Sequence, residues 1–479
     1  MMDYDIDDLW LKIKEIATKK YGLTFYEPLF ELVTFDDMIR IFCSGLPICY
    51  NHWYFGKEYV ELYNKYKANT LPVALECIFN TDPTLCYLLE TNTRVKQILV
   101  MCHAAVGHST VFKNNVIFQE HTKARSALSM MKQFQTLVTE CEELHGEKQV
   151  EDFLDLCHAL SSLAVHHCNV NRTNKTYEKR IKKRQQELLN SESRLSNTLN
   201  LNKKNLPNVK SRFYEENVLA FVGKNSSRLK PWQREIVNGY CALRQYLYPQ
   251  PLMKIIHEGF ANFWESELMD DLYDQKVLSD GEYIEYLIMK ASSNHQLDWD
   301  SKYYSGFNPY ALGYKIFEDI KRICTSPTEE DKKWFPQLIG KNWIDEICYA
   351  AYNFRDSSFI LQYLSPKVMR DLKLFSIDHN RYDDANLINN IHDYEGYEQI
   401  RHRLAMQFDY ISNSPTVYIN GCDFKKSRTL YITIKCNKNR QLIDPAAEVF
   451  KALRKLWGHP IFYYLYNDDD LVYKGNGNE

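Results

Sequence analysis

Val100-Met-Cys-His-Ala-Ala-Val-Gly-His-Ser-Thr-Val-Phe-Lys-Asn114 is the stretch around which this chain is organised. Two histidines, His103 and His108, stand in this otherwise apolar run, and a carboxylate, Glu90, precedes it. Apolar residues recur at helical spacing after Thr93, a typical helix cap, so the stretch predicts a buried helix. His103 belongs to the apolar face of that helix.

The spacing of the two histidines limits how they can act together. Residues three or four positions apart share one face of a regular helix, whereas His108 follows His103 by five. Both side chains can therefore reach one metal ion only if the helix ends or bulges at Gly107. The four-residue separation of helical zinc motifs is a stronger signal than this one.

A second stretch, Ile256-His-Glu-Gly-Phe-Ala-Asn-Phe-Trp264, places His257 and Glu258 among aromatic side chains. It follows the chain break Tyr248-Pro-Gln-Pro251, so Glu258 lies near the start of a long, mostly buried helix. A carboxylate in such surroundings needs a cation, a metal or several hydrogen-bond donors. We therefore expect the two stretches to meet in one buried polar site.

The composition is that of a globular protein with a large interior. The chain has 479 residues, of which 45% are apolar, 25% are charged and 14% are aromatic. This length predicts two or three domains, and the aromatic content indicates heavy packing rather than disorder. The net charge of -3 gives no overall attraction to nucleic acid or to anionic lipid.

Cysteine use and the start of the chain indicate a cytoplasmic protein. The 13 cysteines are scattered and no Cys-x-x-Cys pair occurs, so we expect reduced thiols rather than a disulfide framework. The first residues are acidic, where a signal peptide would be basic and then apolar. No uninterrupted apolar run of about 18 residues occurs, so no membrane span is expected.

The hydropathy pattern predicts a mainly α protein with four parts. Residues 1–170 form a first helical part of the core, and residues 213–379 form a second helical part. Between them, residues 171–212 are polar and basic, which predicts a linker or a solvated helix. Residues 380–479 contain period-two segments and one helix, which predict a small α+β domain.

Three further segments carry local predictions. The turn Asn80-Thr-Asp-Pro83 predicts a helix that begins at its proline and carries Glu90. Asp155 and His158 have the spacing of the carboxylate-x-x-His pairs with which helical bundles bind metals, but accident on a helix surface is the preferred interpretation. His52, in an aromatic loop, is interpreted as a hydrogen-bonded core residue.

Ten short segments of the chain match segments of one known family and occur in the same order as in that family. The segments are His52-Trp-x-Phe-Gly-Lys57, Asn92-Thr93, His103-Ala-x-x-Gly-His108 with Phe112-Lys113 and Asn115, Asp155-x-Cys-His-Ala-Leu160, Tyr248-Pro-Gln250, Glu258-Gly-x-Ala261 with Phe263-Trp264, Gly306-x-Asn-Pro-Tyr-Ala-Leu-Gly313, Asp319-Ile-x-Arg-Ile-Cys324, Trp334-Phe-Pro336 and Leu364-Ser-Pro-Lys-Val368. Together they resemble the stage V sporulation protein R (SpoVR) family over nearly the whole chain, residues 20–470.

Two positions depart from the family pattern. The family has Asn before the Glu-Gly pair, where this chain has His257. It has His after the Phe-Trp pair, where this chain has Glu265. The resemblance therefore carries no role over to these two positions.

The resemblance implies a cellular setting more than a reaction. The family is linked to sporulation and cortex formation in spore formers. It also occurs in other bacteria, beside a PrkA-type serine kinase and a partner with a von Willebrand-like domain. A serine-kinase module is therefore the expected partner, and no settled activity carries over.

The first functional hypothesis is a metal-dependent hydrolase that acts in cell-wall or spore-cortex processes. His103, His108 and Glu258 look like a divergent zincin arrangement, in which two histidines and a glutamate leave one position open for water. Position 104 is Ala, where zincins have the general base. That catalytic role would therefore fall to Glu90 or His158.

Two alternatives stay open. A carboxylate-rich site of the di-iron type would favour Fe or Mn over Zn. Its members would be Glu90, His103, His108, Asp155, His158 and Glu258. In a different class, the chain is a non-enzymatic regulator or scaffold working with the kinase module, and the buried polar residues form a structural hydrogen-bond network. A nucleic-acid role would rest only on the basic run 178–184, so no such partner is expected.

Overall fold

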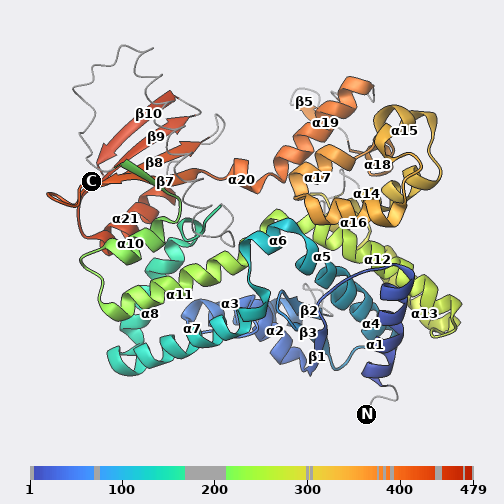
Figure 1. Cartoon of the computed structure of the whole chain (residues 1–479), viewed down its shortest axis with the longest axis horizontal. Coiled ribbons are helices and arrows are strands. Elements are labelled where there is room, and N and C mark those ends of the chain that lie inside the picture. The colour runs from blue at the N-terminus through green and yellow to red at the C-terminus, as the bar shows by residue number, and fades with distance from the viewer. Residues whose placement is uncertain are drawn as a thin grey trace.

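Helices dominate the fold, as the sequence predicts, and the strands form small sheets (Figure 1). The computed structural model describes residues 5–68, 76–167, 212–297, 301, 306–374, 377–380, 385–388, 393–436, 445–467 and 470–476. Within these residues, no helix is long and apolar enough to cross a membrane. The predicted linker, residues 171–212, lies outside the described residues except for Arg212, where a strand begins.

The first part of the chain alternates helices with short strands. Its elements are α1 (Ile6–Glu15), the π-helix η1 (Ile16–Lys20), β1 (Pro28–Val33), α2 (Phe35–Ser44), α3 (Trp53–Lys67), β2 (Glu76–Phe79), β3 (Thr84–Leu89), α4 (Arg94–Val100), the π-helix η2 (Met101–His108), α5 (Ser109–Asn114), α6 (Val116–His121), α7 (Ala124–His145), α8 (Glu147–Ala159) and the 3-10 helix η3 (Ser161–Leu163).

After the linker, helices again dominate until the chain ends in strands. The elements are β4 (Arg212–Glu215), α10 (Val218–Asn225), α11 (Pro231–Leu247), η5 (Gln250–Leu252), α12 (Lys254–Asp274), α13 (Asp280–Ser293), α14 (Pro309–Thr325), α15 (Glu329–Trp334), η6 (Pro336–Leu338), α16 (Trp343–Asn353), α17 (Asp356–Tyr363), α18 (Pro366–Asp371), β5 (Ile377–Asn380), β6 (Ala385–Ile388), α19 (Tyr394–Gln407), α20 (Tyr410–Asn413), β7 (Thr416–Cys422), β8 (Leu430–Cys436), α21 (Pro445–Trp457), β9 (Ile461–Asn467) and β10 (Asp470–Asn476).

A small sheet with the order β1-β3-β2 packs against the histidine stretch. The prediction of a helix from Pro83 is wrong, because the chain enters β3 at Thr84 and pairs in parallel with β1, where Pro28 lies opposite Thr84. All of β3 is buried, since it is the central strand. A continuous apolar run of this length fits a strand covered on both faces, and this overrides the helix-start signal of the proline.

Helix α12 carries the second stretch and is buried along nearly its whole length. It lies between η2 and α14 (Figure 1). A Cβ on Gly107 of η2 would lie 2.5 Å from the Cα of Ala261, and a Cβ on Gly313 of α14 would lie 2.7 Å from the Cα of Gly259. The three backbones approach this closely only because side chains are small or absent there. These residues therefore set how closely α12 packs against η2 and α14.

The N-terminal end of α12 is held by a carboxylate from another helix. Asp356 of α17 accepts hydrogen bonds from the backbone N–H of Ile255 at 2.9 Å and of Ile256 at 3.0 Å. Burial raises the pKa of Asp356 to about 7, although the amides of α12 favour the ionised form. These bonds satisfy helix-terminal donors directly before Glu258 and fix where α12 begins.

Two large buried clusters fill the interior. One is built mainly from residues 9–118 and 248–374, together with α19. The other is built mainly from residues 127–164 and 218–246, together with the C-terminal sheet. Each cluster therefore combines residues from both predicted helical parts, and both candidate stretches lie in the first cluster.

The predicted C-terminal α+β part is confirmed. Its five-stranded sheet has the order β10-β9-β8-β7-β4, and β8 runs parallel to β9, with α21 between them in sequence. Strands β7 and β8 occupy the predicted period-two segments. Strand β4 follows the linker directly and pairs with β7, so the sheet joins residues from two distant parts of the chain (Figure 1).

Candidate metal centre

The two histidines lie on a π-helix rather than on a regular α-helix. Element η2 spans Met101–His108, and all of its residues are buried. A π-helix pairs residue i with residue i+5, so side chains five positions apart become neighbours. The rings of His103 and His108 accordingly lie 4.7 Å apart. The five-residue spacing required a departure from a regular helix, and the structure has one. It extends over the whole of Met101–His108 and is not confined to Gly107.

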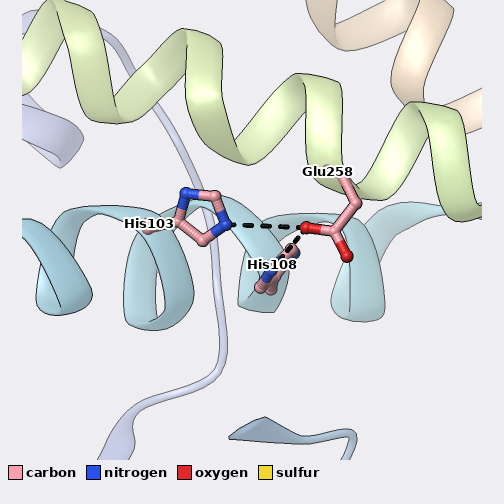
Figure 2. Close-up of side chains that lie close together, drawn as sticks. All are labelled: His103, His108 and Glu258. Carbon is pink, nitrogen blue, oxygen red and sulfur yellow. Dashed lines mark ion pairs between the residues drawn. The ribbon is translucent and has the colours of Figure 1, made fainter. Parts of the chain in front are cut away.

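Glu258 completes a group of three ligand-type side chains (Figure 2). Its Oε2 atom lies 3.7 Å from Nε2 of His103 and 3.5 Å from Nε2 of His108. Figure 2 shows the two histidines on η2 and the glutamate pointing down from α12 toward both. Within the described parts of the chain, no other three His, Cys, Asp or Glu side chains bring their ligand atoms within 4.8 Å of one another.

Glu265 orients the first histidine. Nδ1 of His103 donates a hydrogen bond to Oε2 of Glu265 at 2.8 Å, and both side chains are only 7% exposed. Glu265 follows Glu258 by seven residues, so both carboxylates project from the same face of α12. Because Nδ1 carries the proton that Glu265 accepts, the lone pair of His103 lies on Nε2, which faces Glu258 and His108.

His257 covers the second histidine. Its ring stacks on the ring of His108 at 4.0 Å with an interplanar angle of 12°, and Phe112 packs against it at 4.6 Å. The two positions that depart from the SpoVR pattern, His257 and Glu265, therefore contact the two histidines of the group, His108 and His103. The sequence comparison left both without a role, and the seven-residue spacing on α12 was the signal that could have identified Glu265.

Burial and neighbouring charges set the protonation of the group. Burial lowers the pKa of His108 well below its usual value, with His257 and His103 acting in the same direction and Glu258 against it. Burial alone would raise the pKa of Glu258, but His103, His108 and the Tyr310 hydroxyl outweigh it and lower the pKa. A neutral imidazole and an ionised carboxylate are the forms that bind metal ions.

The two predicted catalytic side chains lie elsewhere. Glu90 is exposed at the turn that follows β3. His158 shares a hydrogen bond of 2.7 Å with the Tyr50 hydroxyl, and its ring stacks on His52 at 4.2 Å. The structure thus brings together His103, His108 and Glu258, but neither Glu90 nor His158 contacts them.

Asp155 makes contacts with His52 and Trp53 that join two helices. Nε2 of His52 lies 3.2 Å from Oδ1 of Asp155, and the same oxygen accepts a hydrogen bond from the Trp53 indole at 2.9 Å. Nδ1 of His52 also accepts from the backbone N–H of Tyr54 and caps α3. These contacts join α3 to α8, in agreement with the interpretation of His52 as a hydrogen-bonded core residue.

Comparison with known proteins gives one family and one curated relative. The family described as SpoVR like protein matches residues 3–413. The uncharacterized protein YcgB of Escherichia coli (strain K12) is 37% identical over 477 residues, which cover 98% of this chain and 93% of that protein. No solved structure gives a significant match. The family match ends just before β7, whereas the match to YcgB includes the C-terminal sheet.

Proposed function

This chain belongs to the SpoVR family, and from that premise we propose that it is a metal-dependent hydrolase whose ion is held by His103, His108 and Glu258. The proposal joins two independent facts. The family is established by a match over most of the chain, and the three side chains converge in a largely buried, polar group on two helices that approach closely where Gly107 meets Ala261.

One observation carries the metal assignment, namely the separation of the ligand atoms. The distances of 3.5 Å and 3.7 Å are longer than the roughly 2.7–3.2 Å of a hydrogen bond. Ligands about 2.0–2.2 Å from one ion in tetrahedral geometry lie about 3.3–3.6 Å apart. The 3.5 Å separation falls within this range and the 3.7 Å separation lies just above it, so the two Glu258–histidine distances support an ion between the side chains better than direct hydrogen bonds.

The ligand set supports a catalytic rather than a purely structural role. Closed structural zinc sites use four protein ligands, while hydrolytic sites use three, often two histidines and one glutamate, and keep one position open. A divalent ion at this position, Zn, Fe or Mn, would supply Lewis-acid activation of water and of a substrate carbonyl. The side chain of Glu258 is 19% exposed, more than those of His103 and His108 at 7% and 6%.

The chain itself would contribute orientation and exclusion of water. Glu265 holds the tautomer and the direction of His103, and the His257 ring, which stacks on His108 and packs against Phe112, shields His108. The Tyr310 hydroxyl hydrogen-bonds Glu258 and would restrain its carboxylate. Such outer contacts raise ligand basicity and fix ring orientation.

We expect substitutions of Glu265 to weaken metal binding in a graded way. Glu265→Gln keeps an acceptor for His103 but loses the charge, so its affinity should fall about 10-fold, while Glu265→Ala should lose about 100-fold. A zinc titration against a competing chelator measures both constants. Equal affinities for wild type, Gln and Ala variants would show that Glu265 plays no part in the centre.

The hydrolase assignment is tested by turnover of metal-loaded protein on amide and ester substrates, peptidoglycan fragments included. Metal-dependent turnover in the wild type that disappears in Glu258→Gln supports the proposal. A wild type that binds metal stoichiometrically but turns over none of these substrates would contradict the hydrolase and leave the centre in place. In that case the regulator working with a serine-kinase module becomes the better account.

A further inference from the structure

A second polar cluster lies where four segments of the chain meet. It contains three imidazoles and two carboxylates, from the end of α6, the residues after η3 and the end of β4. Its members are His121, His166, His167, Glu215 and Glu216. His121 is 5% exposed and Glu216 is 6% exposed, so ionisable groups are buried here without a role in the candidate metal centre.

Gln245 of α11 bridges two of the segments. Its Oε1 accepts a hydrogen bond from the backbone N–H of His166 at 2.7 Å. Its Nε2 donates to the His166 carbonyl at 3.2 Å and to Nδ1 of His121 at 3.1 Å. The His166 backbone thereby fixes the orientation of the amide, and His121 must present an unprotonated Nδ1 to it.

The carboxylates and a tyrosine complete the contacts. Oε2 of Glu216 accepts from the backbone N–H of His167 at 3.2 Å, and Oε1 of Glu215 lies 3.7 Å from Nδ1 of His166. His167 shares a hydrogen bond of 2.9 Å with the Tyr248 hydroxyl. The cluster therefore joins the residues after η3, the residues after β4 and the end of α11.

Helix α6 connects this cluster to the candidate metal centre. His121 and Phe118 are three positions apart and share a face of α6. The His121 ring packs against Tyr248 at 4.9 Å, while the Phe118 ring packs against His257 at 5.7 Å. His257 in turn stacks on His108. A displacement of α6 would thus reach the wall of the centre.

We propose that the cluster of His121, His166, His167, Glu215 and Glu216 is an acid-sensitive clasp, in which protonation of His121 releases α6 from Gln245 and the end of α11. Protonated His121 carries a proton on Nδ1 and can no longer accept from Gln245. Its charge would also lie beside the imidazoles of His166 and His167 in a buried site, with Glu216 opposing them. The clasp acts through the fold and does not depend on a bound metal.

The titration of His121 and His166 has the required sign. Burial lowers the pKa of His121 to about 4, with His167 and His166 acting in the same direction and Glu216 against it. Burial likewise lowers the pKa of His166, against Glu216. Through His121 the open form binds more protons between about pH 6.5 and pH 4, so the closed form is lost as the pH falls through this window. Burial and the charge of Glu216 raise the pKa of Glu215, so this carboxylate has the opposite sign and opposes the opening.

Hydrogen exchange on the metal-free full chain tests the clasp, with protection factors taken relative to intrinsic rates at each pH. The amides of His166 and His167 report on it, since they donate hydrogen bonds to Gln245 and to Glu216 in the closed form. With a pKa of about 6.5 in the open form and about 4 in the closed form, protonation of His121 predicts a roughly 15-fold fall in protection from pH 6.5 to pH 5. His121→Asn keeps an acceptor near Nδ1 but cannot titrate there, so it should remove about 10-fold or more of that fall.

A second variant and a control keep the test decisive if His121→Asn fails to fold. Glu216→Gln retains the acceptor for His167 but removes the charge that favours a protonated His121 in the closed form. Its protection should follow the wild-type fall from pH 6.5 to pH 5 and should continue to fall below about pH 4, where the wild-type curve levels off. His402→Asn, at an exposed histidine of α19, should follow the wild-type curve. Constant wild-type protection from pH 6.5 to pH 5, a Glu216→Gln curve that levels off at the wild-type pH, or a control that behaves like His121→Asn would overturn the clasp.

Discussion

Glu258→Gln should lose more than about 100-fold in metal affinity, beyond the roughly 10–100-fold that loss of an outer contact costs. The neutral amide replaces the one anionic ligand of the group, while the side chain keeps its size. Among the three candidate ligands His103, His108 and Glu258, only Glu258 lies on α12. No second ligand of this group on that helix can take its place. Competition titrations with zinc, iron and manganese measure the loss.

The matched control for this variant is Glu267→Gln. Glu267 lies on the same helix, and its side chain is 19% exposed, as is that of Glu258. It pairs with Lys321 of α14 at 2.5 Å and takes no part in the histidine group. Metal affinity should stay at the wild-type value in Glu267→Gln. If the two variants bound metal equally well, Glu258 would not be a ligand.

Gly259→Ala should destabilise the protein by about 3 kcal/mol, the upper part of the usual range for overpacking. The new Cβ would overlap the backbone of Gly313 in α14, and a backbone cannot rotate out of the way as a side chain can. Separation of α12 from α14 would also shift the neighbouring Glu258 relative to the histidines. Chemical denaturation of the metal-free protein measures the stability.

Gly281→Ala provides the contrasting substitution. Gly281 lies in helix α13, and a Cβ there would meet nothing within 4 Å. Alanine restricts the unfolded chain and favours the helix, so this variant should gain about 0.5–1 kcal/mol. A lower free energy of unfolding in Gly259→Ala together with a higher one in Gly281→Ala would support the close crossing of α12 and α14. A Gly259→Ala protein as stable as the wild type would contradict it.

The three ligand candidates could be predicted because the argument needed only local composition. Two histidines in an apolar run and a glutamate among aromatics must be buried, and buried ionisable groups need partners. That reasoning identified His103, His108 and Glu258 without any knowledge of helix packing. The same local signals identified the mainly α fold and the C-terminal strands, where hydropathy changes its period.

The remaining features depended on packing between distant segments. No particular amino-acid composition identifies a π-helix in a sequence. Element η2 has its wider turn where Gly107 meets Ala261 of α12. Proline at position 83 fits both a helix start and a strand start, and only the neighbours β1 and β2 decide between them. The seven-residue spacing places Glu265 on the same face of α12 as Glu258, but its pairing with His103 also depends on how α12 packs against η2.

Elemental analysis by plasma mass spectrometry, on wild type and on His103→Ala, tests the central claim most directly. Each protein is purified without added metal and again after loading and exhaustive dialysis, with His145→Ala as an exposed-histidine control. If His103, His108 and Glu258 hold a metal ion, the wild type and the control should each contain about one equivalent of Zn, Fe or Mn, and His103→Ala should lose it. No stoichiometric metal in loaded wild type, or equal metal in His103→Ala, would contradict the claim.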